Sequence, residues 1–224
     1  MAFKQVSNKL GQNQPRGFAD SPTDDFPNAL VKTSTKVRTN LRQVERCGVV
    51  IPWVPNERQF MPTRPAVLED LAVIGEIYAN YVRTSVATFE LDPPDAAEWR
   101  RRFEAITGDG LPFLVTERTG VVAGYAYCAP WKTRPAYRAT VEDSVYVAPH
   151  ATGQGCGTDL MRDLLAAAAA AGIRQVIAVI ADTGDPASVE LHRAFGFVDA
   201  GRLTNVGHKH DRFVDTVLLQ RTLS

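Results

Sequence analysis

From about residue 61 onward, apolar residues recur at the spacings of helices and strands. The first such segment follows Asp70, a residue type that can cap a helix. Its apolar positions lie three or four residues apart, as on one buried helix face: Leu71, Ile74, Ile77, Tyr78 and Tyr81. Residues 84–91, TSVATFEL, have the β-branched and aromatic composition of a strand. We therefore expect a helix followed by a strand.

A second helix is expected after the turn-forming sequence of residues 93–95, PPD. Its buried side would carry Trp99, Phe103 and Ile106. Glycines at 108 and 110 would end it. Residues 112–129 then predict two strands that are joined by a turn at Thr119 and Gly120.

Strands and helices continue to alternate toward the C-terminus. Residues 139–147 and 175–182 predict two strands, the second apolar enough to be buried on both faces. The helix between them would stop at Gly172, and a shorter helix would begin at residues 185–186, with Asp as cap and Pro in the first turn. The buried stripe of that shorter helix would consist of Ala187, Leu191, Ala194 and Phe195. Residues 197–203 and 212–220 predict a closing hairpin, and the sum is one α/β (α+β) domain with a mixed sheet.

Residues 1–60 have a different pattern. They are polar, rich in proline and turn formers, and show no sustained period, so we expect a disordered N-terminal extension before a domain over residues 61–224. The apolar segment Cys47–Val54 leaves a docking role open, and Met61 is a candidate natural start. Acidic residues in the extension argue against an organellar targeting role: Asp20, Asp24 and Asp25.

Composition narrows the class of protein. The 224 residues include 25 basic and 25 acidic side chains, so net charge gives no reason to expect nucleic acid or an anionic membrane as partner. No apolar run is long enough to span a bilayer. Three scattered cysteines, Cys47, Cys128 and Cys156, predict neither a disulfide framework nor a metal site. We expect a cytoplasmic protein with no bound metal.

Three alternating glycines stand where the strand over residues 139–147 gives way to a helix: Gly153, Gly155 and Gly157. Glycines allow close backbone approach, and a helix start offers free N–H groups, so the loop predicts a phosphate site; a turn without a ligand is the alternative. A P-loop would need a lysine directly after its last glycine, but Thr158 follows Gly157. A dinucleotide site needs G-x-G-x-x-G in a tight turn, and only Asp182, at a ribose-binding position, favours it.

Residues 145–161 run from a strand through V-x-P and spaced glycines into a helix. This order resembles the acyl-CoA loop of the GNAT N-acetyltransferase superfamily. SVELHRAFGF, residues 188–197, is similar to a second signature of that superfamily. Residues 113–147, 191–197 and 206–220 resemble one branch more closely, the phosphinothricin acetyltransferase group. That group acetylates the amino nitrogen of phosphinothricin, methionine sulfone or methionine sulfoximine. The resemblance covers about residues 61–223.

The resemblance implies a single GNAT-type acyl-CoA N-acyltransferase domain with a mixed, splayed central sheet. It also implies acetyl-CoA as co-substrate, a small-molecule amine as substrate and a homodimer. The strand that would pair with the pantetheine arm consists of Val145, Tyr146 and Val147. The positions that would hold phosphates are Gly153, Gln154, Gly155, Cys156, Gly157 and Thr158. Asp185, near the start of the later helix, is a further cofactor-binding position, although asparagine is usual there. Thr152 and Gly153 also depart from the family, which has polar or basic side chains at these positions.

Acetyl transfer needs a neutral amine, so a base must accept the ammonium proton. Glu142 resembles the family's catalytic glutamate, while Asp143 would alternate to the opposite strand face. The leaving thiolate needs a proton, and His192 stands where many GNAT enzymes have tyrosine and where this branch has histidine. The alternatives are an exposed strand carboxylate for Glu142 and a packed core histidine for His192. Cys156 has no neighbouring base in sequence and is not expected to be a nucleophile.

Aromatic and basic residues are the candidates for substrate recognition, because an amino acid with a second acidic group needs cations and apolar walls. They are Phe89, Trp131, Lys132, Arg134 and Tyr137, with Lys209 and Arg212 as further candidates. The acidic Glu90 stands next to Phe89 at the end of the predicted early strand and is also a candidate. The alternative for each charged residue is a solvated surface position.

Three other functions stay open from the residues alone. They are acetylation of a protein N-terminus or another amine, a non-catalytic acyl-CoA-binding module, and dinucleotide binding.

Overall fold

A computed structural model describes residues 63–223. The predicted extension over residues 1–60, the segment Cys47–Val54 and the candidate start at Met61 lie outside the described residues, and they stay predictions. Each element below belongs to the compact unit that spans Val54–Ser224.

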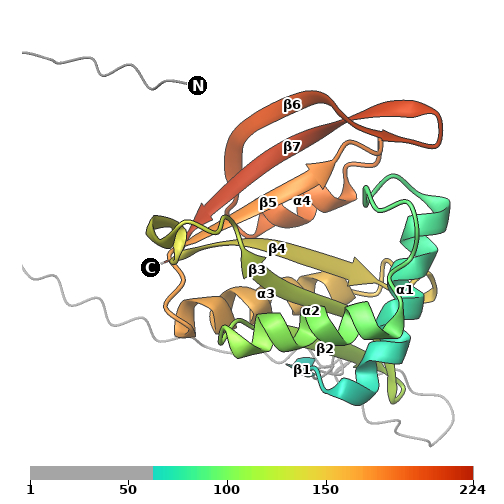
Figure 1. The fold of residues 1–224 in the computed structure, drawn as a ribbon, viewed down its shortest axis with the longest axis vertical. Coiled ribbons are helices and arrows are strands. Elements are labelled where there is room, and N and C mark those ends of the chain that lie inside the picture. The colour runs from blue at the N-terminus through green and yellow to red at the C-terminus, as the bar shows by residue number, and fades with distance from the viewer. Residues whose placement is uncertain (1–62, 224) are drawn as a thin grey trace, which may run out of the picture. The chain divides into compact units, whose positions relative to one another are not determined.

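The described residues form a seven-stranded sheet (Figure 1). In spatial order its strands are β1 (Thr63–Pro65), β2 (Phe113–Arg118), β3 (Val121–Pro130), β4 (Thr140–Val147), β5 (Gln175–Ala181), β7 (Arg212–Thr222) and β6 (Val198–Lys209). Only β4 and β5 run parallel within this sheet, and the other neighbours are antiparallel. The expected mixed sheet in an α+β domain is therefore confirmed.

Helices cover both faces of the sheet. One face carries α1 (Leu71–Thr84) and α2 (Ala96–Gly108), and the other carries α3 (Cys156–Ala170) and α4 (Ala187–Ala194) (Figure 1). All four were expected at these places in the chain. The Asp95 side chain caps α2 by accepting from the Glu98 N–H, as the predicted helix start requires.

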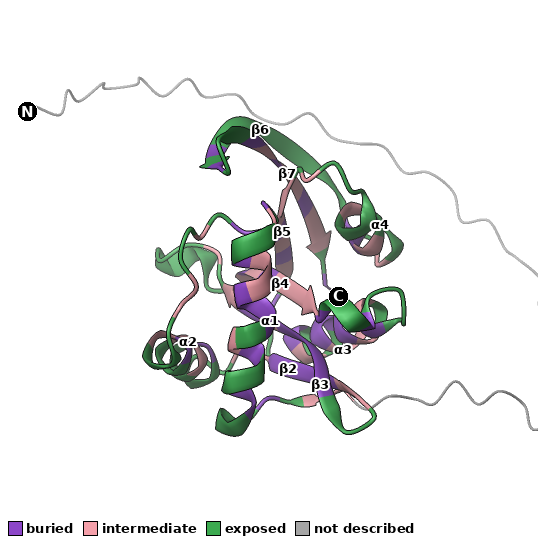
Figure 2. Cartoon of the chain, turned by 90° about the vertical axis from the view of Figure 1, so that its right-hand side faces the viewer, coloured by how far each residue is buried: buried purple, intermediate pink, exposed green. Residues whose placement is uncertain are grey.

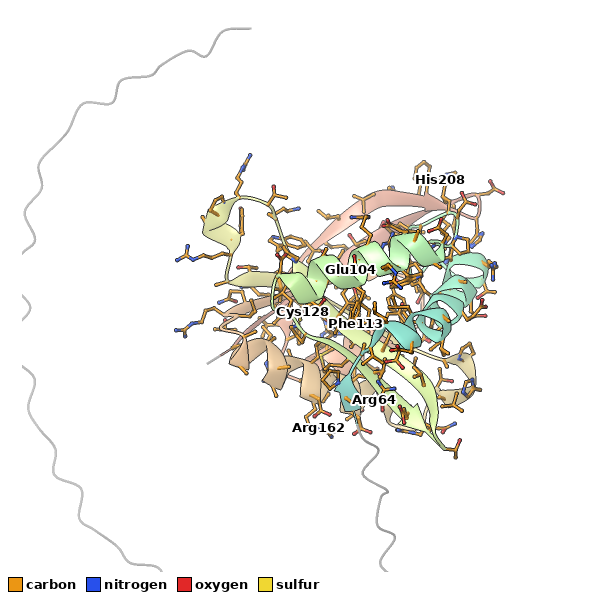
Figure 3. The ribbon with its side chains drawn as sticks, turned by 60° about the horizontal axis from the view of Figure 1, so that its bottom comes forward. Arg64, Glu104, Phe113, Cys128, Arg162 and His208 are labelled. Atoms are coloured by element: carbon orange, nitrogen blue, oxygen red, sulfur yellow. The ribbon has the colours of Figure 1, made fainter. Side chains whose placement is uncertain are left out.

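Two apolar clusters hold the layers together, and Figure 2 shows β2 and β3 largely buried between them. On the first face, the Trp99 ring meets Tyr78 and Tyr125 edge-on, with ring centroids 5.4 and 5.9 Å apart. Phe113 lies beneath α2, whereas the exposed Glu104 lies on that helix (Figure 3). On the second face, α3 buries Leu160, Met161 and Leu164 completely. A long strand edge is left on the outside, where β6 is mostly exposed.

Three local predictions were wrong. Residues 85–95 form a loop, because Thr88 bonds to side chains from other elements instead of pairing in the sheet. β5 is fully buried only at Val176 and Ala178, because its second half, from Ala178 to Ala181, lines a cavity. In α4 the buried residue is His192; Leu191 and Phe195 are half-buried, and Ala187 and Ala194 are exposed. The hydrogen bond between His192 and Asp143 on β4 sets the rotation of this helix.

The sheet splits between β4 and β5. These strands pair only from Thr140 opposite Gln175 to Glu142 opposite Ile177. Beyond that point β4 stays paired with β3 as far as Val147, and β5 stays paired with β7 as far as Ala181. The split therefore leaves one backbone edge of β4 free over its last residues, as the expected splayed sheet requires.

The loop over residues 85–95 is fixed against β6. A Cβ added at Gly207 would lie 2.4 Å from Cζ of Phe89, so only glycine leaves room for this ring. Nearby, the buried Lys209 ammonium donates to the Thr88 carbonyl oxygen over 2.8 Å. Loop and hairpin are thus held together by ring packing and one charged hydrogen bond.

We predict that Gly207→Ala destabilises the protein by about 1–3 kcal/mol, because the new methyl group overpacks the Phe89 contact. Urea unfolding measures the difference. Gly108→Ala is the matched control, since an added Cβ there meets nothing within 4 Å and alanine favours a helix. Equal stability of the two variants would contradict the packing argument.

Candidate active site

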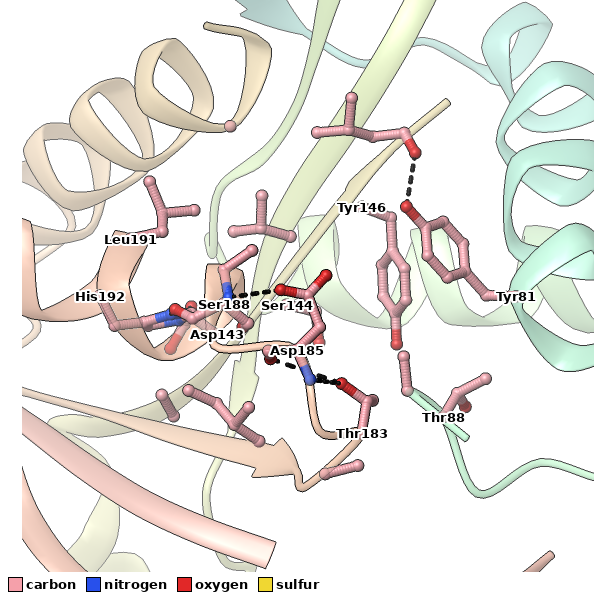
Figure 4. Close-up of a pocket in the computed structure, with 18 of the residues that line it drawn as sticks. Tyr81, Thr88, Asp143, Ser144, Tyr146, Thr183, Asp185, Ser188, Leu191 and His192 are labelled. Carbon is pink, nitrogen blue, oxygen red and sulfur yellow. Dashed lines mark hydrogen bonds and ion pairs between the residues drawn. The ribbon is translucent and has the colours of Figure 1, made fainter. Parts of the chain in front are cut away.

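A cavity of about 870 Å³ opens where β4 and β5 separate (Figure 4). Its walls come from β4, β5, the glycine loop, the start of α4, α1 and the loop over residues 85–95. Tyr81, Tyr146 and Thr88 lie on one side in this view, and Asp143 and His192 lie on the other. The split of the sheet thus creates the space, and elements far apart in sequence supply its side chains.

The free edge of β4 forms one wall, with Val145, Tyr146 and Val147 all lining the cavity. These three predicted residues pair with β3 on one side and with no strand on the other. The Tyr81 hydroxyl donates to the Val147 carbonyl oxygen over 2.7 Å and so satisfies part of the edge. An unpaired edge of this kind can pair with an extended ligand, as a further strand would.

The glycine loop lies at the end of that edge. Gly153 and Gly155 have φ angles of 73° and 82°, in the left-handed region that favours glycine, and α3 begins directly afterwards at Cys156. An added Cβ at either glycine would meet nothing within 4 Å, so there is room beside the backbone. The first N–H groups of α3 lack partners within the helix and can bind an anion.

Most predicted loop residues line the cavity: Thr152, Gly153, Gly155, Cys156, Gly157 and Thr158. Gln154 does not, because its side-chain amide donates to the His150 carbonyl oxygen and its own carbonyl accepts from Arg118. Cys156 is buried, and burial raises the pKa of its thiol, which fits the prediction that it is no nucleophile.

Glu142 is half-buried in the cavity wall, at the last residue where β4 and β5 pair. Burial raises the pKa of its carboxyl, and the nearby charge of Asp143 raises it further, while Lys132 lowers it. A carboxylate whose pKa is raised by burial is a better proton acceptor than a solvated one. The geometry therefore suits a general base.

His192 is buried and lines the same cavity. Its Nδ1 lies 2.6 Å from the Ser188 carbonyl oxygen, and its Nε2 lies 2.9 Å from Oδ2 of Asp143. Burial lowers the pKa of the ring, but the hydrogen bond and charge of Asp143 outweigh it, so the pKa of His192 is raised. Both ring nitrogens have partners, and proton donation to a ligand would break the Asp143 contact.

Asp185 also lines the cavity, and its side chain accepts from the N–H of Ala187 over 3.0 Å. From two residues before α4, the carboxylate thus binds the first N–H group of that helix, and when ionised it has no donor to offer a ligand.

The predicted substrate residues are only partly brought together. Phe89 lines the cavity, whereas Trp131, Lys132, Arg134 and Tyr137 belong to a loop that is not part of its wall. The Lys132 ammonium lies over the Trp131 ring, 4.4 Å from its centroid. Glu90 pairs with Arg102 over 2.8 Å, Lys209 is buried against Thr88, and Arg212 is exposed on the hairpin.

Asp143 is a functional candidate that the sequence did not predict, because it was expected only to lie on the strand face opposite Glu142. It stands between Val141 and Val145 on the face of β4 that packs toward α3, so strand alternation places a carboxylate among buried apolar residues. A buried acid needs a partner, and this was the available signal. Tyr127 and Ser144, which line the cavity on the Glu142 side of the strand, were also missed.

Within residues 63–223, no group of histidine, cysteine and acidic side chains is placed to hold a metal ion. No helix in this part of the chain is long and apolar enough to cross a membrane.

Comparison with known proteins identifies relatives over most of the chain. Residues 76–197 match the acetyltransferase (GNAT) family. The phosphinothricin N-acetyltransferase of Alcaligenes faecalis is 50% identical over 156 residues, covering 70% of this chain and 79% of that protein. The L-methionine sulfoximine/L-methionine sulfone acetyltransferase of Pseudomonas paraeruginosa is 36% identical, covering 71% and 93%.

Solved structures agree. A GNAT superfamily phosphinothricin acetyltransferase from Sinorhizobium meliloti, in complex with AcCoA, superposes with a TM-score of 0.71 at 44% identity, covering 74% of this chain and 89% of that one. An acetyltransferase from Salmonella typhimurium with its cofactor acetyl-CoA gives a TM-score of 0.71 at 35% identity, covering 73% and 94%.

Proposed function

This chain belongs to the acetyltransferase (GNAT) family, and on that premise we propose that it acetylates the amino group of a small amino-acid analogue such as phosphinothricin, methionine sulfone or methionine sulfoximine. As a member of this family it is an acetyl-CoA-dependent N-acetyltransferase. The observation that carries the proposal is one cavity that combines a free strand edge, a glycine loop at a helix start and a half-buried glutamate.

The residues present fit the co-substrate. The edge at Val145–Val147 would pair with the pantetheine arm, and the N–H groups of Gly155, Cys156 and Gly157 would hold the pyrophosphate. Acetyl-CoA supplies the acyl group as a thioester. Thr152 and Gly153 bring no basic side chain to the phosphates, so at these two positions the contact would depend on backbone N–H groups and the Thr152 hydroxyl.

We propose that Glu142 is the general base. It accepts the ammonium proton, so that the neutral amine can attack the thioester carbonyl carbon. His192 would protonate the departing sulfur from the opposite face of β4. The Cys156 thiol in the cavity wall has a pKa raised by burial and is not activated as a nucleophile, so we propose direct transfer in a ternary complex without a covalent intermediate on the enzyme.

Phe89 is the residue that would contact the carbon chain of the amine, because its ring both lines the cavity and packs on Gly207. The predicted contacts from Trp131, Lys132, Arg134 and Tyr137 require their loop to approach the cavity. Among these four residues, Lys132 already acts on the site, because its charge lowers the pKa of Glu142.

We infer a cytoplasmic homodimer. Two free, buried cysteines, Cys128 and Cys156, suit a reducing compartment. Exposed apolar side chains on the β6–β7 hairpin suit a covered interface: Val198, Leu203, Val206 and Phe213. Light scattering after gel filtration tests the dimer.

The decisive assay follows thiol release from acetyl-CoA with the three proposed amines and compares wild type with Glu142→Gln. We expect kcat to fall about 10²–10⁴-fold in the variant, with the KM for acetyl-CoA nearly unchanged, because only the proton acceptor is lost. Glu104→Gln, on the exposed side of α2, is the control and should keep full activity. Unchanged kcat in Glu142→Gln would remove this residue from the mechanism.

Other results of the assay separate the remaining functions. Acetyl-CoA binding without turnover on any amine would indicate an acyl-CoA-binding module. Turnover on peptide N-termini but not on these amines would indicate a different acceptor.

The glycine loop gives a second prediction. Gly155→Ala should weaken CoA binding about tenfold, since a left-handed alanine costs roughly 1–2 kcal/mol and the free loop relaxes away from the binding conformation. Titration calorimetry measures the affinity. Gly120→Ala is the matched control, because Gly120 has a similar φ of 79° and open surroundings in the β2–β3 turn, away from the cavity. Equal affinity of both variants would exclude the loop from phosphate binding.

The pH dependence gives a third prediction. The base must be ionised, so kcat/KM should rise as pH increases through the pKa of Glu142, which burial and Asp143 place above the ordinary glutamate value. Lys132→Met removes a charge that lowers this pKa, and the acidic limb should move to higher pH. If the acidic limb of the kcat/KM profile lies at the same pH in Lys132→Met, the ionisation of Glu142 does not produce that limb.

A further inference from the structure

Asp143 and His192 form a buried pair on the face of β4 opposite Glu142. Only 1% of the Asp143 side chain and 6% of the His192 side chain is exposed. The Ser188 carbonyl oxygen can only accept a hydrogen bond, so Nδ1 of His192 must carry a proton. A second proton must then lie between Nε2 and Oδ2, which are 2.9 Å apart. The pair therefore holds two protons.

The surroundings favour that second proton on the ring. Asp143 supplies the one charge that bonds to the imidazole, and its other oxygen, Oδ1, is buried without a hydrogen-bond partner. Two neutral groups also lie beside the pair: the Cys128 thiol from β3, opposite Asp143, and the Phe197 ring, 5.0 Å from the His192 ring by centroids. Arg193, the next residue of α4, pairs instead with Asp199 over 2.9 Å. Glu142 faces the other side of the sheet.

The position of the pair matters for chemistry. Asp143 follows the last β4–β5 pairing by one residue, and both partners line the cavity beside the free edge. The pair therefore joins β4 to α4 across the base of the split sheet. It stands on one face of β4 while the proposed base stands on the other.

We propose that Asp143 is a positioning residue that acts through His192, holding a proton on Nε2 at the cavity wall for the sulfur that leaves during acyl transfer. This rests on the proposed function. Glu142 accepts the first proton from the ammonium, and the neutral amine then forms the N–C bond. The nitrogen of this adduct loses its second proton to solvent as the C–S bond breaks with its electron pair on sulfur. The Nε2–Oδ2 contact breaks as Nε2 gives its proton to that sulfur, leaving His192 neutral with Nδ1 still bonded to Ser188 and Asp143 still a carboxylate. Solvent then returns the Nε2 proton, and Glu142 releases its own.

The test is Asp143→Asn, which keeps the shape of the side chain and removes its charge. Asp199→Asn is the matched control, because it removes an exposed carboxylate that bonds to the same helix but not to the ring. Nitrogen-15 NMR of the histidine rings in the enzyme without ligands reports the protonation of His192 directly. The pH profile of kcat is measured on the same proteins, and Asp143→Ser serves if the asparagine variant does not fold.

We expect wild-type His192 to carry protons on both nitrogens at neutral pH. In Asp143→Asn the ring should lose its Nε2 proton at a pH at least one unit lower, and the alkaline limb of kcat should move with it. At alkaline pH this lowers kcat about tenfold or more, because one pKa unit is a tenfold change in the protonated fraction. The KM for acetyl-CoA and the Asp199→Asn profile should not change.

Two results would overturn the inference. If the ring titrates identically in Asp143→Asn, Asp143 does not hold the proton, and the role of Glu142 is untouched. If the ring shifts but the alkaline limb does not, His192 is not the proton donor and the pair serves only to join β4 to α4. Failure of the proposed function itself would look different, with no turnover in the wild type on any of the three amines.

Discussion

The site depends on one interruption of backbone pairing, the end of the β4–β5 ladder at Glu142 and Ile177. Each lost backbone hydrogen bond costs on the order of 1 kcal/mol when nothing replaces it. The structure limits that cost by keeping both strands paired on their outer sides, β4 with β3 and β5 with β7. The Tyr81 hydroxyl satisfies the Val147 carbonyl at the free edge. The split can therefore persist as a permanent cavity with an edge that is ready for an extended ligand.

Strand alternation then divides the chemistry between two faces. Glu142, Ser144 and Tyr146 face the aromatic layer beneath α1 and α2, while Asp143 faces α3 and α4. Adjacent residues can thus hold charges in different surroundings, one half-buried in the cavity and one paired with an imidazole. The sheet keeps the two carboxylates apart, although the charge of Asp143 still contributes to the raised pKa of Glu142.

Local signals were sufficient for most of the fold. The period of α1, the Asp95 cap of α2, the Thr119–Gly120 turn and the glycines before α3 each act within a few residues, and each predicted element formed. The wrong predictions depend on distant contacts. Residues 85–95 lack a strand because Tyr78 and Lys209 bind Thr88, and α4 buries His192 because Asp143 lies on another element. Periodicity cannot report such partners, nor that residues 131–137 lie outside the cavity wall.

The two raised pKa values also define when the site can work. In the proposed mechanism Glu142 must be ionised and His192 protonated at the same time, so activity requires a pH above the first pKa and below the second. Burial of Glu142 raises the lower boundary and makes it a stronger base. Asp143 raises the upper boundary by favouring the charged ring, against the effect of burial. A single carboxylate on β4 therefore moves both boundaries in the same direction.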